Sequence, residues 1–356
     1  MSGKGGAVQE LKVGKLFPFF YGYVILFACT VGKILTAPGQ SPCIGVVIGV
    51  IVKDLDISLT TVTASYFIAT TTSAVCLTKM GKIIDRFGVQ NMVAIIATML
   101  GAACFVASIA QNVPTLLVAF FMLRFFGQGS LMMVSKTTIN YWWIELRGTM
   151  MGVAGAMVSL GMTGVFPIIL NIGIENVGWR AVYVNLGFTS ILFMAPFGYM
   201  FYRPQPENFG LLPDGKDPAV AVAHTAKEKS GESEEAAPDD DAAAASDGDN
   251  NNNSEVNWEA KDAFKTMRFW SNTTSVAVIA ATATAFWFHL KSVMVDYSID
   301  SGLVHVIYPI LAVSGFIGRI WSGRLIDTFE ENGYLVLVIG LLLQVVAMVL
   351  IQTMAI

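Results

Sequence analysis

The strongest constraint on this chain is a series of apolar runs, each long enough to cross a lipid bilayer. A spanning helix needs about 20 mostly apolar residues. Nine stretches meet this requirement: residues 18–38, 58–78, 91–110, 114–135, 148–170, 181–202, 272–292, 302–322 and 334–354. Only 13% of the residues are charged, against roughly a quarter in an ordinary soluble domain. The sequence therefore predicts an all-α membrane protein with about nine transmembrane helices.

The positive charges of the short connections predict how these helices are oriented. Short cytoplasmic loops carry an excess of Lys and Arg. With the N-terminus inside, the inner short segments hold eight basic residues, against Lys53, Arg180 and Lys291 on the opposite side. The eight are Lys4, Lys12, Lys15, Lys79, Lys82, Arg86, Arg147 and Arg324. We therefore expect residues 1–17 to be cytoplasmic, and because no organelle address is evident, the plasma membrane is the default location.

One long acidic connection divides the chain. Residues 203–265 carry 15 Asp and Glu against 6 Lys and Arg. Low hydrophobicity and high net charge predict that its central part, residues 217–257, is disordered. It could be a regulatory or trafficking segment, or a solvated tether. The predicted organisation is a six-helix bundle over residues 18–202, an acidic and largely disordered cytoplasmic loop over 203–271, and three helices over 272–356.

Two short segments on the predicted cytoplasmic side repeat each other. Gly81-Lys82-Ile83-Ile84-Asp85-Arg86-Phe87-Gly88 and Gly323-Arg324-Leu325-Ile326-Asp327 each place a glycine four residues before an aspartate. Such an internal repeat favours a duplicated bundle, as in many secondary transporters.

Residues 81–88 resemble the loop between helices two and three of the major facilitator superfamily. Arg124-Phe125-Phe126-Gly127-Gln128-Gly129 resembles its fourth-helix motif, and the glycines from Gly152 to Gly164 with Pro167 resemble its fifth-helix motif. The resemblance implies a bundle of 12 helices, so we expect the second bundle to be incomplete and the chain to be C-terminally truncated.

A more specific pattern resembles the branch that contains oxalate/formate antiporters and monocarboxylate transporters. It consists of Tyr21-Gly22-Tyr23, Arg147-Gly148, Gly178-Trp179-Arg180, and Arg203-Pro204 through Gly210-Leu211-Leu212-Pro213. This resemblance implies a small organic anion as cargo.

The repeated segments supply the candidate gating residues. They are Gly81, Asp85, Arg86, Gly88, Gly323 and Asp327. In the superfamily the loop aspartate caps a helix N-terminus in the opposite half, a position where negative charge is stabilised. The resemblance implies that Asp327 braces the start of the fifth helix. The helix that Asp85 would cap, the eleventh, has no counterpart in this sequence.

Arg319 is the leading candidate for substrate binding. A charge inside the membrane is costly and usually functional, and Gly318-Arg319 matches the arginine that pairs with a substrate carboxylate in the resembled branch. Its planar fork suits two carboxylate oxygens. The alternative is an arginine that snorkels to the cytoplasmic surface. Gly315 stands where proton-coupled relatives carry an aspartate, which argues against the same coupling arrangement.

Three further residues complete the candidate substrate site. Arg124 lies in the fourth predicted helix, where the resemblance implies a role in gating or proton transfer, and it could also help to bind the substrate. The alternative is a structural arginine that hydrogen-bonds helix-end carbonyls. Lys33 either attracts an anion or snorkels. Gln40 follows Pro38 and Gly39, where some proton-linked relatives carry a lysine, and offers a neutral hydrogen bond. Trp142 and Trp143 are predicted to be interfacial anchors.

The predicted function is secondary transport of a mono- or dicarboxylate by alternating access, coupled to protons or to a counter-anion. No ATP-binding loop, metal pair or nucleophile elbow is found in the sequence, so we expect no enzyme activity, cofactor, metal or nucleic-acid partner; the oligomeric state stays open. One alternative is a transporter of a neutral solute. Another is a non-transporting membrane partner or sensor.

Overall fold

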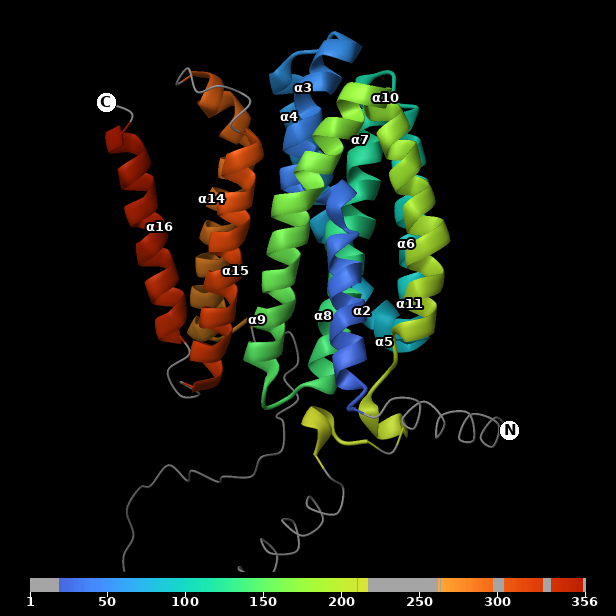
Figure 1. Cartoon of the computed structure of the whole chain (residues 1–356), viewed down its shortest axis with the longest axis vertical. Coiled ribbons are helices and arrows are strands. Elements are labelled where there is room, and N and C mark those ends of the chain that lie inside the picture. The colour runs from blue at the N-terminus through green and yellow to red at the C-terminus, as the bar shows by residue number, and fades with distance from the viewer. Residues whose placement is uncertain are drawn as a thin grey trace, which may run out of the picture. The chain divides into compact units, whose positions relative to one another are not determined.

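The structure, a computed structural model, describes residues 19–209, 211–216, 262, 264–296, 304–328 and 334–354. Within those ranges every regular element is a helix, which confirms the predicted all-α membrane bundle (Figure 1). Four of the helices described there are long and apolar enough to span a membrane: Val89–Ser108, Val113–Trp142, Arg147–Phe201 and Val306–Thr328. The expectations of a disordered segment over 217–257 and of a cytoplasmic segment over 1–17 lie outside the described residues.

The helices follow the chain in this order: α2 (Gly22–Ile34), η1 (Ala37–Gly39), α3 (Ser41–Leu55), α4 (Leu59–Leu77), α5 (Met80–Phe87), α6 (Val89–Ser108), α7 (Val113–Met122), η2 (Leu123–Leu131), α8 (Met132–Trp142), α9 (Arg147–Val158), η3 (Ser159–Val165), α10 (Phe166–Phe188), η4 (Thr189–Met194), α11 (Ala195–Phe201), η5 (Pro206–Phe209), η6 (Pro213–Gly215), α14 (Met267–Asp296), α15 (Val304–Thr328) and α16 (Tyr334–Met354).

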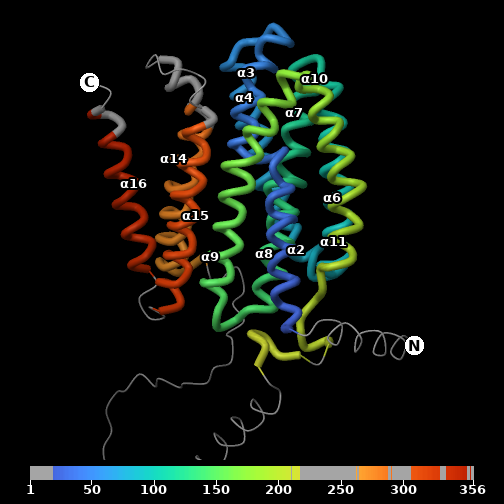
Figure 2. Tube along the Cα trace, viewed as in Figure 1, coloured from blue at the N-terminus to red at the C-terminus, as the bar shows by residue number. Residues whose placement is uncertain are grey.

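The first span is longer than its predicted range of 18–38. It continues beyond a break at η1 into α3, as the trace in Figure 2 shows. The break places Gly39 against η2, where a Cβ atom would lie 2.2 Å from the Leu123 carbonyl oxygen. Pro42 then stands in the first turn of α3, where its missing N–H costs nothing. The predicted range followed the apolar run and ended at Pro38, inside this interruption.

The fourth span is also longer than predicted. The apolar window ends at residue 135, but the helix runs through α7, η2 and α8 to Trp142. The middle stretch, η2, is a π-helix, a rare variant inside α-helices that is frequently found at functional sites. The extension brings Lys136 inside the span.

The connection after residue 170 is mostly helical. The helix turns sharply at Gly178, whose φ is 80°, a value that favours glycine. The next residue, Trp179, donates its indole N–H to Asp54 at 3.2 Å. Arg180 also pairs with Asp54 and donates to the Ala110 carbonyl at 3.0 Å. This motif therefore ties the bend of α10 to the last turn of α3 and to the residues that follow α6, at one end of the bundle.

The opposite end, called here the basal end, carries the start of α2, α5, the start of α9 and residues 203–215 (Figure 1). Trp142 and Trp143 lie here and are each only 1% exposed, so their prediction as interfacial anchors is wrong. Trp143 donates to the Gly22 carbonyl at 3.3 Å, and both rings pack against Phe20. Buried indoles need such partners for their N–H groups.

Helices α9 and α15 approach each other through glycine. A Cβ atom on Gly152 would lie 2.6 Å from the Arg319 carbonyl oxygen, and one on Gly323 would lie 2.5 Å from the Gly148 carbonyl oxygen. Small residues allow such backbone contact between membrane helices. This contact fixes the position of Arg319.

The chain divides into two compact units, Met1–Gly215 with Thr282–Ile356, and Lys216–Ala281. All contacts of the cavity and gate discussed below belong to the first unit. In the second, Trp270 near the start of α14 donates its indole N–H to the Phe264 carbonyl at 2.9 Å.

Candidate substrate cavity and gate

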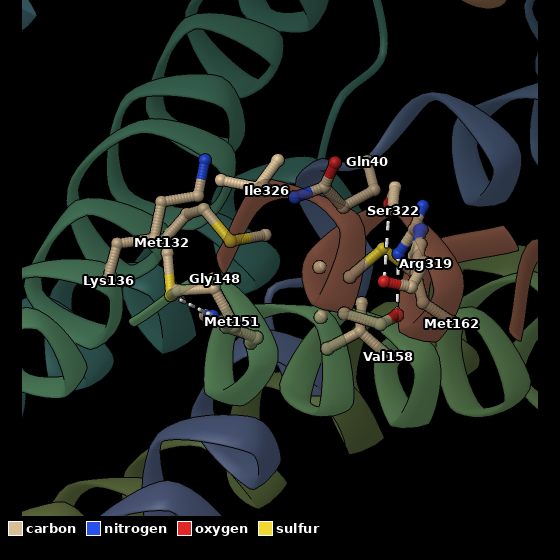
Figure 3. A pocket seen from close by; sticks show the side chains of 14 residues that line it. Gln40, Met132, Lys136, Gly148, Met151, Val158, Met162, Arg319, Ser322 and Ile326 are labelled. Carbon is tan, nitrogen blue, oxygen red and sulfur yellow. Dashed lines mark hydrogen bonds between the residues drawn. The ribbon is translucent and has the colours of Figure 1, made fainter. Parts of the chain in front are cut away.

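A cavity of about 490 Å³ opens between α2, α8, α9 and α15. Its volume lies in the range of pockets that hold small molecules. Its lining comes from distant parts of the sequence: Lys33, Gln40, Met132, Lys136, Gly148, Met151, Gly152, Gly155, Val158, Met162, Arg319, Ser322, Gly323 and Ile326. Figure 3 shows the labelled side chains, with Lys136 and Arg319 on opposite sides of the view.

Three of the lining residues are cationic and none is acidic. Lys33, Lys136 and Arg319 therefore bring three positive charges to the wall of a single cavity. Among the described residues, no carboxylate forms an ion pair with any of the three. Like charges gathered in a low-dielectric site attract an anion.

Lys33 belongs to the last turn of α2 and is only 4% exposed. Its ammonium nitrogen lies 3.8 Å from the Met151 sulfur, which is a weak acceptor. The side chain therefore stays inside the protein. This placement does not match the snorkelling alternative.

Arg319 lies on α15 and is held against α9. Its Nη1 donates to the Gly155 carbonyl at 2.7 Å. A Cβ atom at Gly155 would lie 3.2 Å from the Arg319 Cδ atom, so the glycine provides room for the arginine. A guanidinium carries five N–H donors, and this backbone contact orients the group.

Lys136 is a cavity residue that the sequence interpretation missed. It belongs to α8, one turn after Met132, and both side chains line the cavity. Residues four apart share a helix face. The four-residue spacing of Met132 and Lys136 could have identified Lys136 from the sequence. Using it would have required extending the predicted helix beyond residue 135, where the apolar window ends.

Arg124 is buried but is not among the residues that line the cavity. Its Nη1 donates to the Gly39 carbonyl at 3.1 Å, and its guanidinium carbon lies 5.0 Å from the centre of the Tyr66 ring. Gly39 ends η1, where the first span is interrupted and carbonyls lose their helical partners. Arg124 therefore donates to a carbonyl at the end of a helix, as the alternative of a structural arginine predicted.

Gln40 does line the cavity. It precedes α3 as its N-cap and has extended backbone geometry. Its amide nitrogen donates to the Thr36 hydroxyl at 2.9 Å. The structure thus brings Lys33, Gln40 and Arg319 together, and leaves Arg124 outside their group.

The Asp327 carboxylate reaches the first turn of α9. Its oxygens accept hydrogen bonds from the Gly148 N–H at 2.8 Å and the Thr149 N–H at 2.5 Å. These N–H groups have no partner within their own helix, and negative charge is favourable there. The contact expected between Asp327 and the start of the fifth helix is present, and Gly323 lies one turn away in the same seam.

The first copy of the repeat forms the short helix α5 and has different surroundings. Asp85 is exposed and accepts a hydrogen bond from the Tyr141 hydroxyl at 3.4 Å. The Arg86 guanidinium lies over the Phe87 ring. Gly88 ends α5 with a φ of 78°, whereas a Cβ atom at Gly81 would meet nothing within 4 Å. The structure places these four residues together at the basal end, away from the seam of Asp327.

The family model of the Major Facilitator Superfamily matches residues 34–355 of the chain. The match covers the seam between α9 and α15 and all of the cavity-lining residues except Lys33, which lies one residue before it. A comparison of the chain with curated proteins found no match.

Proposed function

The chain belongs to the Major Facilitator Superfamily and is therefore a secondary transporter in a lipid bilayer, not an enzyme; we propose that its cargo is a small organic anion, a mono- or dicarboxylate. The observation that carries this proposal is the cationic cavity. Lys33, Lys136 and Arg319 line it without an acidic residue among them. A neutral solute would leave this charge uncompensated, which is costly in a low-dielectric interior.

Arg319 is the principal carboxylate ligand in this proposal. Its guanidinium is oriented by the Gly155 carbonyl and offers the fork geometry that suits a carboxylate. Lys33 and Lys136 attract the anion as compact charges, and Gln40 adds a neutral donor. The resemblance to oxalate/formate antiporters and monocarboxylate transporters in residues 21–23, 178–180 and 203–213 supports the same cargo class.

The proposed mechanism is alternating access, in which the half-bundles over residues 18–202 and 272–356 rock around the cavity. The contact of Asp327 with the start of α9 would brace the cytoplasmic gate and break when the gate opens. Coupling to a proton or to a counter-anion completes the proposal. The Lys and Arg distribution favours a cytoplasmic N-terminus, and the plasma membrane remains the default location.

Uptake into liposomes tests the cargo. The purified full chain is reconstituted, and uptake of labelled carboxylates with one to six carbons is measured. Arg319→Ala should weaken carboxylate binding by about 10- to 100-fold, because hydrogen bonds to charged groups contribute about 1.5–3 kcal/mol. Arg324→Ala is the matched control, because Arg324 is an exposed residue of the same helix that does not line the cavity.

The proposal is wrong if no carboxylate is taken up, or if neutral analogues compete as well as charged ones. Equal loss in both arginine variants would also contradict the assigned role of Arg319.

A further inference from the structure

The segment after the sixth span folds back across the basal end. The Pro204 carbonyl accepts a hydrogen bond from the Trp142 indole N–H at 2.8 Å. The Phe209 ring centre lies 6.2 Å from that of Trp142. At the far end of the segment, a Cβ atom on Gly215 would lie 3.1 Å from the Phe20 ring. Residues 203–209 and 211–215, called here the basal clasp, are therefore packed against the bundle.

Asp214 of the basal clasp binds the backbone just before α9. Its carboxylate accepts hydrogen bonds from three consecutive N–H groups, those of Ile144 at 3.1 Å, Glu145 at 2.9 Å and Leu146 at 3.2 Å. Hydrogen bonds to a carboxylate are roughly twice as strong as those between neutral groups. This loop connects α8, which carries Lys136, to α9.

The backbone of Asp214 is unusual as well. Its φ of 60° and ψ of 8° place it in the left-handed region, which few residues other than glycine adopt. Such a conformation persists only where the surroundings enforce it. The hydrogen bonds to the loop and the packing of the basal clasp hold Asp214 in this conformation.

Two carboxylates thus bind neighbouring parts of the backbone at the start of α9. Asp214 holds residues 144–146, and Asp327 holds Gly148 and Thr149. Asp214 follows the sixth span, whereas Asp327 belongs to α15, two spans later in the chain. Of these two carboxylates, Asp327 is the one that joins α9 to the helix that carries Arg319.

We propose that Asp214 is a positioning residue for the gate: it fixes the loop before α9 so that the Gly148 and Thr149 N–H groups face Asp327. The proposal rests on the alternating-access function above. In this proposal, the hydrogen bonds of Asp214 to residues 144–146 persist through the transport cycle, while those of Asp327 to Gly148 and Thr149 break and re-form. The loop then needs no reordering each time the gate closes, which lowers the entropic cost of closure.

Hydrogen–deuterium exchange of the full chain in lipid nanodiscs tests this arrangement, with single-residue resolution from electron-transfer fragmentation. Asp214→Asn should speed exchange at residues 144–146 and also at 148–149, by roughly 3- to 10-fold, which corresponds to the net strength of single hydrogen bonds. Asparagine tolerates positive φ, so this variant keeps the turn. Asp327→Asn should speed exchange only at residues 148–149.

Asp54→Asn is the matched control because Asp54 pairs with Arg180 at the opposite end of the bundle. It should leave exchange at residues 144–149 unchanged. Unchanged exchange within α6 in every variant verifies that the bundle is folded.

The proposal is overturned if Asp214→Asn leaves residues 148–149 unchanged, since Asp214 would then act only on its own loop. It is also overturned if Asp327→Asn speeds exchange at residues 144–146 equally. In uptake, Asp214→Asn should lower the maximal rate by several-fold without changing the half-saturating concentration. A complete lack of carboxylate uptake would refute the proposed cargo but leave the exchange result interpretable.

Discussion

The glycine seam between α9 and α15 leads to a quantitative prediction for Gly152→Ala. The new methyl group would lie 2.6 Å from the Arg319 carbonyl oxygen and 3.2 Å from the Gly323 Cα atom. Both neighbours are backbone atoms, so no side-chain rotation can relieve the contact. The helices have to separate by roughly 0.5–1 Å before the atoms reach ordinary van der Waals distance.

Two opposing effects set the size of the change. Alanine is a better helix former than glycine by about 1 kcal/mol, whereas overpacking of this kind costs about 1–3 kcal/mol. Gly318→Ala isolates the first effect, because Gly318 is also helical and a Cβ atom there would meet nothing within 4 Å. Relative to Gly318→Ala, we therefore expect Gly152→Ala to be less stable by about 1–3 kcal/mol.

Thermal unfolding of the purified protein in one detergent provides the assay. A change of 1 kcal/mol shifts Tm by about 2–4 °C in a protein of several hundred residues, so the two variants should differ by several degrees. Carboxylate affinity should fall in parallel for Gly152→Ala, because the seam positions Arg319 in the cavity. If Gly152→Ala melts at or above the temperature of Gly318→Ala, the close approach of the two helices is wrong.

Three further changes test separate contacts. Lys136→Gln should weaken anion binding by about 10-fold or more, from the loss of a charged hydrogen-bond donor; unchanged inhibition constants in competition uptake would exclude Lys136 from the site. Asp327→Asn should lower the free energy of unfolding by about 1–2 kcal/mol through loss of a charged helix cap. The comparison is Asp262→Asn, whose exposed side chain pairs with Lys265 three residues later; equal stability of the two variants would contradict the cap. Arg124→Leu should destabilise the protein by about 1–3 kcal/mol, because the Gly39 carbonyl loses its donor in a buried place; a variant with wild-type Tm but reduced anion affinity would instead favour a direct role in binding.

The class of fold was predictable because lipid imposes long apolar helices, and the family assignment followed from short motifs in the right order. The Asp327 contact was predictable for a similar reason, since a carboxylate at a helix N-terminus is a local and recurring interaction. Its partner helix came from the resemblance and not from any pattern in the residues themselves.

The cavity composition was harder to predict, because it depends on which helix faces meet. Lys136 was missed because the end of a helix does not coincide with the end of an apolar window. The place of Arg124 in a motif suggested a binding residue. Its guanidinium instead donates to the Gly39 carbonyl, which lacks a helical partner because the first span is interrupted there. That break is visible only once the first span is seen to continue into α3.

The methionines of the cavity wall have a consequence for the range of cargo. Met132, Met151 and Met162 face the same space as the three cations. Thioether side chains are unbranched, polarisable and able to adopt many shapes, which suits surfaces that accept varied partners. A wall of this kind can adjust to short and long carbon chains alike, while the three cations would select a negative head group under the proposed function. The expected transporter is therefore strict about charge and permissive about length.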